Sequence, residues 1–292
     1  MFEKILIPID FSKFSKYALH CGIQLAEKCG AEVFVVHILN FLANIEQAAK
    51  GIAPGVNWLA AVGKDLKEFV AAEAYERQRL DVLANENVYS EILKYARHHN
   101  AELIVVGSHG RSDFVNTILG STTQRLMRHS PIPVMVVPKT RNEGMPMKFQ
   151  NLLVPIDFSD ISIKALRLGI QMAQSWNSIL HLIHVVDLDA YSEAQKSAGR
   201  ALPELPETLD VSPTINSIVE KAEYKGSSKI TTVLGDPGEE ILRYAGEHDI
   251  DFIVMGSHGR KGLDRILIGS TATAVAKHSP VPIISICEQI PE

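Results

Sequence analysis

The segment EILKYARHHNAELIVVGSHGR at residues 91–111 returns as EILRYAGEHDIDFIVMGSHGR at residues 240–260. The blocks around it repeat as well: KILIPIDFS (4–12) returns as NLLVPIDFS (151–159), and HSPIPVMVV (129–137) as HSPVPIISI (278–286). The offset is 147 residues at the first block and 149 from the second block onward. A period this long indicates a duplicated domain, because the units of a solenoid are far shorter.

The duplication divides the 292 residues into two nearly equal parts. We predict a first domain over residues 1–140, a linker over 141–149 and a second domain over 150–292. Gly144 and Pro146 interrupt any regular pattern in the linker, as expected where one domain hands over to the next.

Within each copy, short apolar runs alternate with amphipathic helical stretches. Runs this apolar are typical of strands covered on both faces, so the pattern predicts an α/β fold, a doubly wound parallel sheet with helices on both sides. The expected strands are Ile5–Ile9, Val33–Leu39, Leu103–Val106 and Val134–Val137, then Leu152–Ile156, Ile179–Val186, Ile230–Leu234, Phe252–Met255 and Ile283–Ile286. The clearest helices of the first copy are expected at Ser15–Lys28 and Ser90–His98.

The two copies differ in their middles. The second has a third strand at Ile230–Leu234, followed by the turn Gly235-Asp236-Pro237. The first has a long helical stretch, about Trp58–Leu80, and only a weak strand candidate at Asp81–Ala84.

Composition excludes several classes of protein. The 29 Lys and Arg against 34 Asp and Glu leave a net charge of −5, which argues against nucleic-acid binding. No apolar run approaches the roughly 20 residues that span a bilayer, and the opening MFEKILIPID does not resemble a signal peptide, so we expect a cytoplasmic protein without membrane insertion. The three cysteines lack the spacing of a metal site, so we interpret them as small buried residues, and no metal site is expected.

A pair of glycines leaves the expected strand 103–106, and a third glycine opens the next helix. These are Gly107, Gly110 and Gly120, and the same spacing recurs in the second copy as Gly256, Gly259 and Gly269. A loop at the carboxyl end of a parallel strand faces the crevice where such sheets bind ligands. Glycines there bring backbone N–H groups close to an anion, and a helix start adds further donors.

This pattern predicts a cradle for a polyphosphate, to which the hydroxyls of Ser121 and Ser270 could add donors. The alternative interpretation is that the glycines only form turns. The pattern matches neither the lysine-containing P-loop nor the Gly-x-Gly-x-x-Gly dinucleotide loop.

Asp10 and Asp157 follow the first strand of each copy. A carboxylate at this sheet edge can accept hydrogen bonds from ribose hydroxyls or an adenine amine, or it can cap the helix that follows. Because Ser12 and Ser159 suit the capping role better, a ligand role for the aspartates is favoured.

His109 and His258 lie inside the glycine loops and Arg111 and Arg260 follow them. The histidines could act as acid or base, but a hydrogen bond beside a phosphate or a surface position is the favoured interpretation. Phosphate pairing and plain solvation are equally open for the arginines.

The doubled Gly-x2-Gly-x9-Gly-[Ser/Thr] motif, the opening PIDFS and the closing HSP-x-P strand resemble the universal stress protein family, and the resemblance covers nearly the whole chain. It implies five strands ordered 3-2-1-4-5 in each copy. It also implies a pseudo-two-fold pairing of Val134–Val137 with Ile283–Ile286, an intramolecular pseudodimer, and leaves further association into a homodimer open.

One subclass of that family binds ATP or AMP through the glycine motif, so the resemblance implies an adenine-nucleotide-binding protein of the stress response. It places Asp10, Asp157 and the backbone of Ile38 and Val185 at the adenosine end. The phosphate end would be held by Gly107, Gly110, Gly120, Ser121, Gly256, Gly259, Gly269, Ser270 and Thr271, with His258, Arg111 and Arg260 beside them.

The first copy departs from the pattern, since Asp113 stands where the second has Gly262 and its helical middle could fill the adenine pocket. The second copy is therefore the safer nucleotide site.

Two functions from different classes follow. The favoured one is a regulatory module whose ATP or AMP occupancy biases binding of an unidentified protein partner, with Mg²⁺ accompanying a triphosphate. The alternative is a slow ATP hydrolase or phosphotransferase, for which the loops offer only Asp113 and Asp264 as nearby carboxylates. No catalytic residue is assigned. A third hypothesis, a structural scaffold that binds no ligand, would give the glycines of the motif no role in binding.

Overall fold

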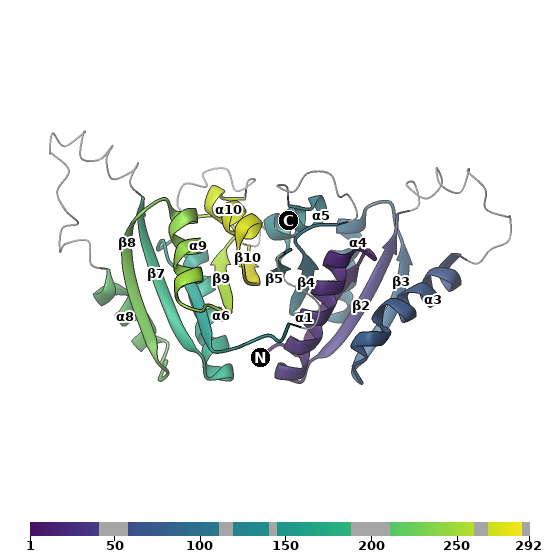
Figure 1. Ribbon diagram of the computed structural model, residues 1–292, viewed down its shortest axis with the longest axis horizontal. Helices are drawn as coiled ribbons and strands as arrows, with labels where there is room; N and C mark the ends of the chain where they lie inside the picture. The colour runs from purple at the N-terminus through teal and green to yellow at the C-terminus, as the bar shows by residue number, and fades with distance from the viewer. Residues whose placement is uncertain (41–57, 111–118, 140–144, 188–210, 260–267, 288–292) are drawn as a thin grey trace. The chain divides into compact units, whose positions relative to one another are not determined.

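The computed structural model describes residues 1–40, 58–110, 119–139, 145–187, 211–259 and 268–287. The chain forms two compact units, one over Met1–Met147 and one over Lys148–Glu288. Figure 1 labels the elements of both. Among the described residues, no helix is both long and apolar enough to cross a membrane.

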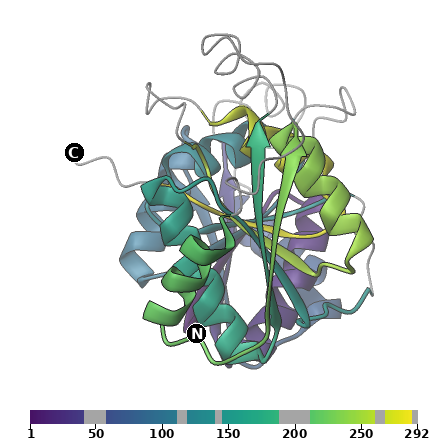
Figure 2. The ribbon, with the colours of Figure 1, turned by 90° about the vertical axis from the view of Figure 1, so that its left-hand side faces the viewer.

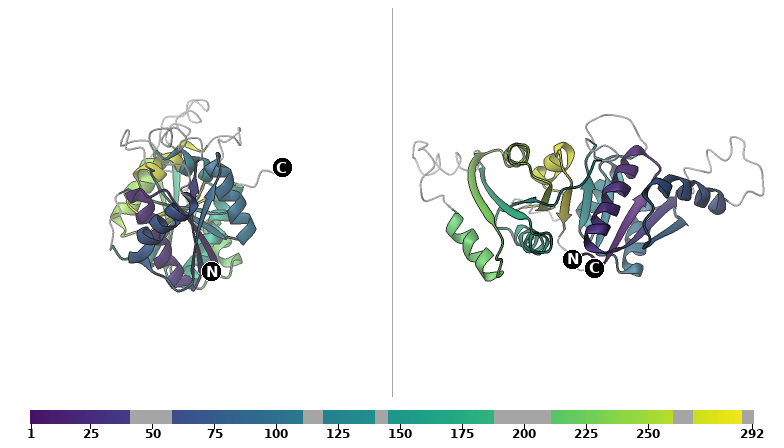
Figure 3. Two further views of the ribbon diagram at one scale, coloured as in Figure 1. Left: turned by 90° about the vertical axis from the view of Figure 1, so that its right-hand side faces the viewer. Right: turned by 60° about the horizontal axis from the view of Figure 1, so that its bottom comes forward.

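The first unit is a five-stranded parallel sheet in the order β3-β2-β1-β4-β5. Its strands are β1 (Lys4–Ile9), β2 (Glu32–Leu39), β3 (Gln78–Ala84), β4 (Leu103–Gly107) and β5 (Val134–Val137). Its helices are α1 (Lys13–Cys29), α3 (Trp58–Val70), the short 3-10 helix η1 (Ala71–Glu73), α4 (Val88–His99) and α5 (Ser121–His129). Helices α1 and α3 cover one face of the sheet, and α4 and α5 cover the other (Figure 3, left).

The second unit repeats this architecture, with parallel strands in the order β8-β7-β6-β9-β10. Its strands are β6 (Asn151–Pro155), β7 (Ile179–Asp187), β8 (Ser228–Gly235), β9 (Phe252–Gly256) and β10 (Ile283–Ile286). Its helices are α6 (Asp160–Trp176), α8 (Ser212–Lys221), α9 (Pro237–Glu247) and α10 (Ser270–His278). In Figure 2, β7 and β8 run between α9 on one side and α6 and α8 on the other.

The predicted α/β class and the 3-2-1-4-5 order are thus found within each unit. The central strands are apolar because both faces are covered: Leu6, Leu103 and Ile104 in the first unit are fully buried. Predicted strands agree with the observed ones to within two residues at each end, apart from the third strand of the first copy.

The middle of the first copy is where the sequence prediction was wrong. The expected helix to Leu80 ends at Val70, and the weak candidate at Asp81–Ala84 is a full strand, β3, from Gln78. Polar residues obscured this strand in the sequence because it lies at the edge of the sheet, where its side chains are only partly buried. Arg79 pairs with Glu32 on β2 at 2.8 Å, and Asp81 accepts a hydrogen bond from the Tyr95 hydroxyl.

Candidate nucleotide-binding site

The carboxylates of Asp10 and Asp157 lie where the first strand of each unit hands over to its first helix. Ser12 and Ser159 cap those helices through their side chains, as predicted. The aspartates also take part in these helix starts, because Oδ1 of each aspartate accepts a hydrogen bond from the backbone N–H of the capping serine at 3.0 Å. This bond fixes the carboxylate and turns its second oxygen, Oδ2, toward the glycine loop.

The second glycine of each loop lies against that oxygen. A Cβ atom placed on Gly110 would be 2.9 Å from Oδ2 of Asp10, and one on Gly259 would be 2.4 Å from Oδ2 of Asp157. Only glycine allows so close an approach without displacing the carboxylate. The aspartate and the loop, far apart in sequence, therefore form one site at the carboxyl edge of each sheet.

The third glycine of the motif opens the helix beside the loop. The N–H of Gly120 donates to the carbonyl of Ser108 at 2.8 Å, and that of Gly269 to Ser257 at 2.9 Å, so loop and helix start are held together. Gly120 and Gly269 are the N-caps of α5 and α10, and neither helix has a side-chain cap. Among the described helices, four begin at a residue whose side chain caps them, namely Ser12, Asn87, Ser159 and Asp236, whereas α8 also begins without a side-chain cap.

Uncapped glycine starts leave the first N–H groups of α5 and α10 oriented along the positive end of the helix dipole. An oxyanion of a ligand can satisfy such donors. The side chains of Ser121 and Ser270, the first residues of these helices, are exposed to solvent.

The first glycine of each loop has a packing role of its own. A Cβ on Gly107 would lie 2.7 Å from the carbonyl oxygen of Phe14 in α1, and one on Gly256 would lie 2.8 Å from Cγ2 of Ile161 in α6. These two glycines allow the first helix to approach the fourth strand, whether or not a ligand binds.

The remaining predicted residues lie near this edge or outside the described part. Ile38 comes one residue after His37, which pairs with Ile9 at the end of β1, and Ile38 is buried. Val185 comes two residues after Ile183, which pairs with Pro155 at the end of β6. Thr271 is half-buried in the first turn of α10. Arg111, Arg260, Asp113, Gly262 and Asp264 lie outside the described residues.

The loop histidines contact the serines before them. Nδ1 of His109 lies 2.9 Å from Oγ of Ser108, and Nδ1 of His258 lies 3.0 Å from Oγ of Ser257. The His109 ring also packs on Phe14, with centroids 5.2 Å apart. Burial and the nearby charge of Lys139 lower the pKa of His109, so this ring is neutral at pH 7.

Two features that the sequence prediction did not include also shape the site. Phe11 and Phe158, next to the aspartates, adopt the left-handed backbone conformation at φ 64° and 63°, which is uncommon for a bulky residue. His37 and His184 each donate from Nδ1 to the carbonyl before the aspartate, at 2.6 Å. The repetition of PIDFS and of a histidine near the end of the second strand was the available signal.

The family model of the universal stress protein family matches residues 1–138 and again residues 148–286. The chain belongs to this family. It carries two universal stress protein domains in tandem, each with the loop and helix geometry described above.

Relatives support the same assignment. Universal stress protein Slr1230 of Synechocystis sp. is 21% identical over 314 aligned residues, which cover 97% of this chain and 99% of that protein. Universal stress protein MJ0531 of Methanocaldococcus jannaschii is 30% identical over 139 residues, 47% of this chain and 81% of that protein. The fold is that of the crystal structure of a universal stress protein from Archaeoglobus fulgidus, with a TM-score of 0.66 at 22% identity over 97% of this chain and 98% of that one.

Proposed function

We propose that each universal stress protein domain of this chain binds an adenine nucleotide, ATP or AMP, at the carboxyl edge of its sheet, and that occupancy regulates binding of a protein partner. Two observations, present in both units, carry the proposal. The second glycine of the loop lies so close to the aspartate that only glycine fits there, and the helix beside the loop begins without a side-chain cap. The aspartate can accept hydrogen bonds from ribose hydroxyls, and the N–H groups of the helix start can donate to phosphate oxygens.

In the proposed complex, Asp10 and Asp157 accept from the ribose, and the backbone at Ile38 and Val185 meets the adenine. The phosphates lie against the third glycine and the helix start behind it, Gly120-Ser121 and Gly269-Ser270, with Thr271 beside the latter. Arg111, His258 and Arg260 are proposed at the phosphate end. Among the described residues, no group of three or more His, Cys, Asp or Glu side chains could hold a metal ion, so Mg²⁺ is proposed only as a companion of a triphosphate.

The aspartate role gives a direct test. We expect Asp157→Asn to weaken ATP binding to the second domain about tenfold, because a charge-assisted hydrogen bond to a ribose hydroxyl becomes a neutral one. The amide oxygen can still accept from Ser159, so the helix start is preserved. Asp160→Asn, an exposed position in the first turn of α6, is the matched control and should leave affinity within twofold.

The competing function, slow phosphoryl transfer, rests on the 3.0 Å contact between Ser257 and His258. We expect phosphate release from ATP to be slower than one turnover per minute, since a positioned base alone does not replace a metal-holding carboxylate. Faster release that disappears in His258→Ala would favour the enzyme, and unaltered ATP affinity in Asp157→Asn would argue against the binding site itself.

A further inference from the structure

Helices α4 and α5 of the first unit contact each other and carry an excess of positive charge. They hold four Lys and Arg residues and one carboxylate, Glu91, a net charge of +3 in a chain whose overall charge is −5. Glu91 is only 13% exposed, accepts from Asn85 Nδ2 at 2.6 Å and lies 3.9 Å from Lys94 Nζ. The basic face consists of Lys94 and Arg97 on α4 and of Arg125 and Arg128 on α5, with Tyr89 of α4 in contact with Arg125.

Most of this positive charge is accessible to solvent. The Lys94 side chain is 78% exposed, and Arg97 and Arg125 are exposed as well. The Arg125 guanidinium lies over the ring of Tyr89, 4.7 Å from its centroid. Stacking of this kind orients a guanidinium while its edge keeps N–H donors for a carboxylate.

His129, the last residue of α5, lies in the same positively charged surroundings. Its ring packs edge-on against the ring of Tyr89, with the ring centroids 6.4 Å apart. Burial, followed by the charges of Arg128 and Arg125, lowers the pKa of His129. The ring therefore adds an aromatic surface without further positive charge at neutral pH.

The second unit uses the same two helices differently. The positions that correspond to Tyr89, Arg97 and Arg125 are occupied by Gly238, Gly246 and Ala274. A Cβ on Gly238 would lie 3.1 Å from Cβ of Ala274, so a contact between small residues replaces the aromatic–cation contact. Close packing of these helices thus does not require the basic residues, which points to another role for them.

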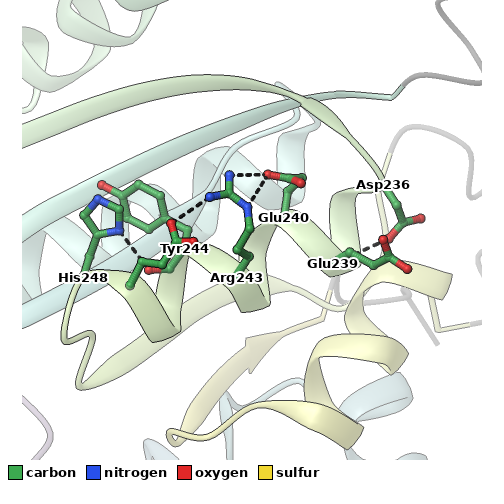
Figure 4. Close-up of polar contacts among 7 residues, drawn as sticks. Asp236, Glu239, Glu240, Arg243, Tyr244 and His248 are labelled. Carbon is green, nitrogen blue, oxygen red and sulfur yellow. Dashed lines mark hydrogen bonds and ion pairs between the residues drawn. The ribbon is translucent and has the colours of Figure 1, made fainter.

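The charge of the second unit's face is compensated within the helix. Arg243 of α9 donates to Glu240 at 2.5 and 3.1 Å (Figure 4). It also donates to Glu247 at 2.7 Å. Helices α9 and α10 together hold three carboxylates and two Lys or Arg residues, a net charge of −1. Of these two corresponding helix pairs, only α4 and α5 carry an excess of positive charge.

We propose that the basic face on α4 and α5 is a docking surface for an acidic segment of a partner protein, whose carboxylates pair with Arg125, Arg97 and Lys94. Arginine and aromatic residues are enriched at the energetic centres of protein interfaces, and a guanidinium matches a carboxylate in two-point hydrogen bonding. A nucleic acid is a poorer fit, because the chain is acidic overall and the face spans only the 12 residues of α4, about 18 Å.

The test uses the whole chain and a fluorescently labelled oligoglutamate peptide, with anisotropy as the readout at low ionic strength. We expect the peptide to bind, an oligoglutamine peptide not to bind, and added salt to weaken binding. Combining Arg97→Ala with Arg125→Ala should reduce affinity at least roughly tenfold. Alanine already stands at the position of Arg125 in the second unit, so the helix tolerates it.

The control variant combines Arg243→Ala with Lys277→Ala, which removes the Lys and Arg residues of the corresponding helices. An equal loss in this control, or no peptide binding to the unaltered protein, would overturn the proposal. Tighter binding of duplex DNA or of phosphatidylserine vesicles than of the peptide would overturn the choice of a protein segment. The assay contains no nucleotide, so this surface and the nucleotide site can fail independently. Should Arg125→Ala unfold the domain, Arg125→Gln keeps the side-chain length and serves the same comparison.

Discussion

Gly259→Ala is expected to weaken nucleotide binding by the second domain strongly, without abolishing it. The added Cβ would lie 2.4 Å from Oδ2 of Asp157, closer than a Cβ atom normally comes to another heavy atom, so either the loop or the carboxylate must move. Both belong to the proposed site, and the carboxylate is also held by the N–H of Ser159. We expect affinity to fall on the order of 100-fold, or about 2.7 kcal/mol.

Gly246→Ala provides the matched control, because a Cβ there meets no atom within 4 Å. The same comparison is available in the first domain between Gly110→Ala and Gly63→Ala, since Gly63 is also surrounded by open space. Titration calorimetry measures the affinities, and circular dichroism checks that each variant is folded. Equal affinities for Gly259→Ala and Gly246→Ala would mean that the glycine loop does not contact the ligand.

The stability of the second domain is expected to fall as the pH is lowered from about 6.5 to about 4. His181 on β7 is 1% exposed, with Nδ1 3.0 Å from the Tyr244 hydroxyl and Nε2 3.3 Å from Oδ1 of Asn151. Burial, followed by the charges of Lys229 and His248, lowers its pKa to about 4.

An unfolded chain, in which the histidine titrates near 6.5, therefore binds a proton that the folded chain excludes. The stabilisation is complete above pH 6.5 and is lost as the pH approaches 4. A difference of this size in pKa corresponds to roughly 3 kcal/mol.

His181→Phe should remove this contribution. The first domain already carries Phe34 at the corresponding position, where it packs against Tyr95 with centroids 6.2 Å apart. Urea unfolding of both proteins between pH 4 and pH 7 measures how the free energy of unfolding changes with pH. This pH dependence should be weaker in the variant, whatever its stability at pH 7. His98→Phe, at an exposed position, should leave the pH dependence as it is. A variant as sensitive to acid as the parent protein would locate the proton uptake elsewhere.

Much of the fold could be predicted because its signals are local. Buried strands such as Val134–Val137 and Ile283–Ile286 read directly as apolar runs, and their observed bounds are the predicted ones. Strand β3 could not be recognised with the same ease, since its Arg79 and Asp81 are satisfied by Glu32 and Tyr95, partners that only the folded sheet brings near. An edge strand with polar residues resembles a helix or loop until its neighbours are known.

The site divides in the same way. Glycine spacing predicted which loops and which helix starts would meet, and the contact of residues 108–110 with Gly120 follows it. The approach of Gly259 to Asp157 joins residues about 100 positions apart and depends on β6 and β9 being neighbours. The left-handed backbone at Phe11 and Phe158 leaves no residue-type signal, because phenylalanine rarely adopts it. The pairing of the last strands of the two copies stays a prediction from the family resemblance.

Calorimetric titration of the purified, nucleotide-free chain with ATP and with AMP, in the presence of Mg²⁺, tests the central claim most directly. The account predicts saturable binding with a stoichiometry near two nucleotides per chain, because both units carry the aspartate, the glycine loop and the uncapped helix start. A stoichiometry near one would remove the claim for one domain, and Gly110→Ala and Gly259→Ala would identify which. The absence of binding by either nucleotide would contradict the account.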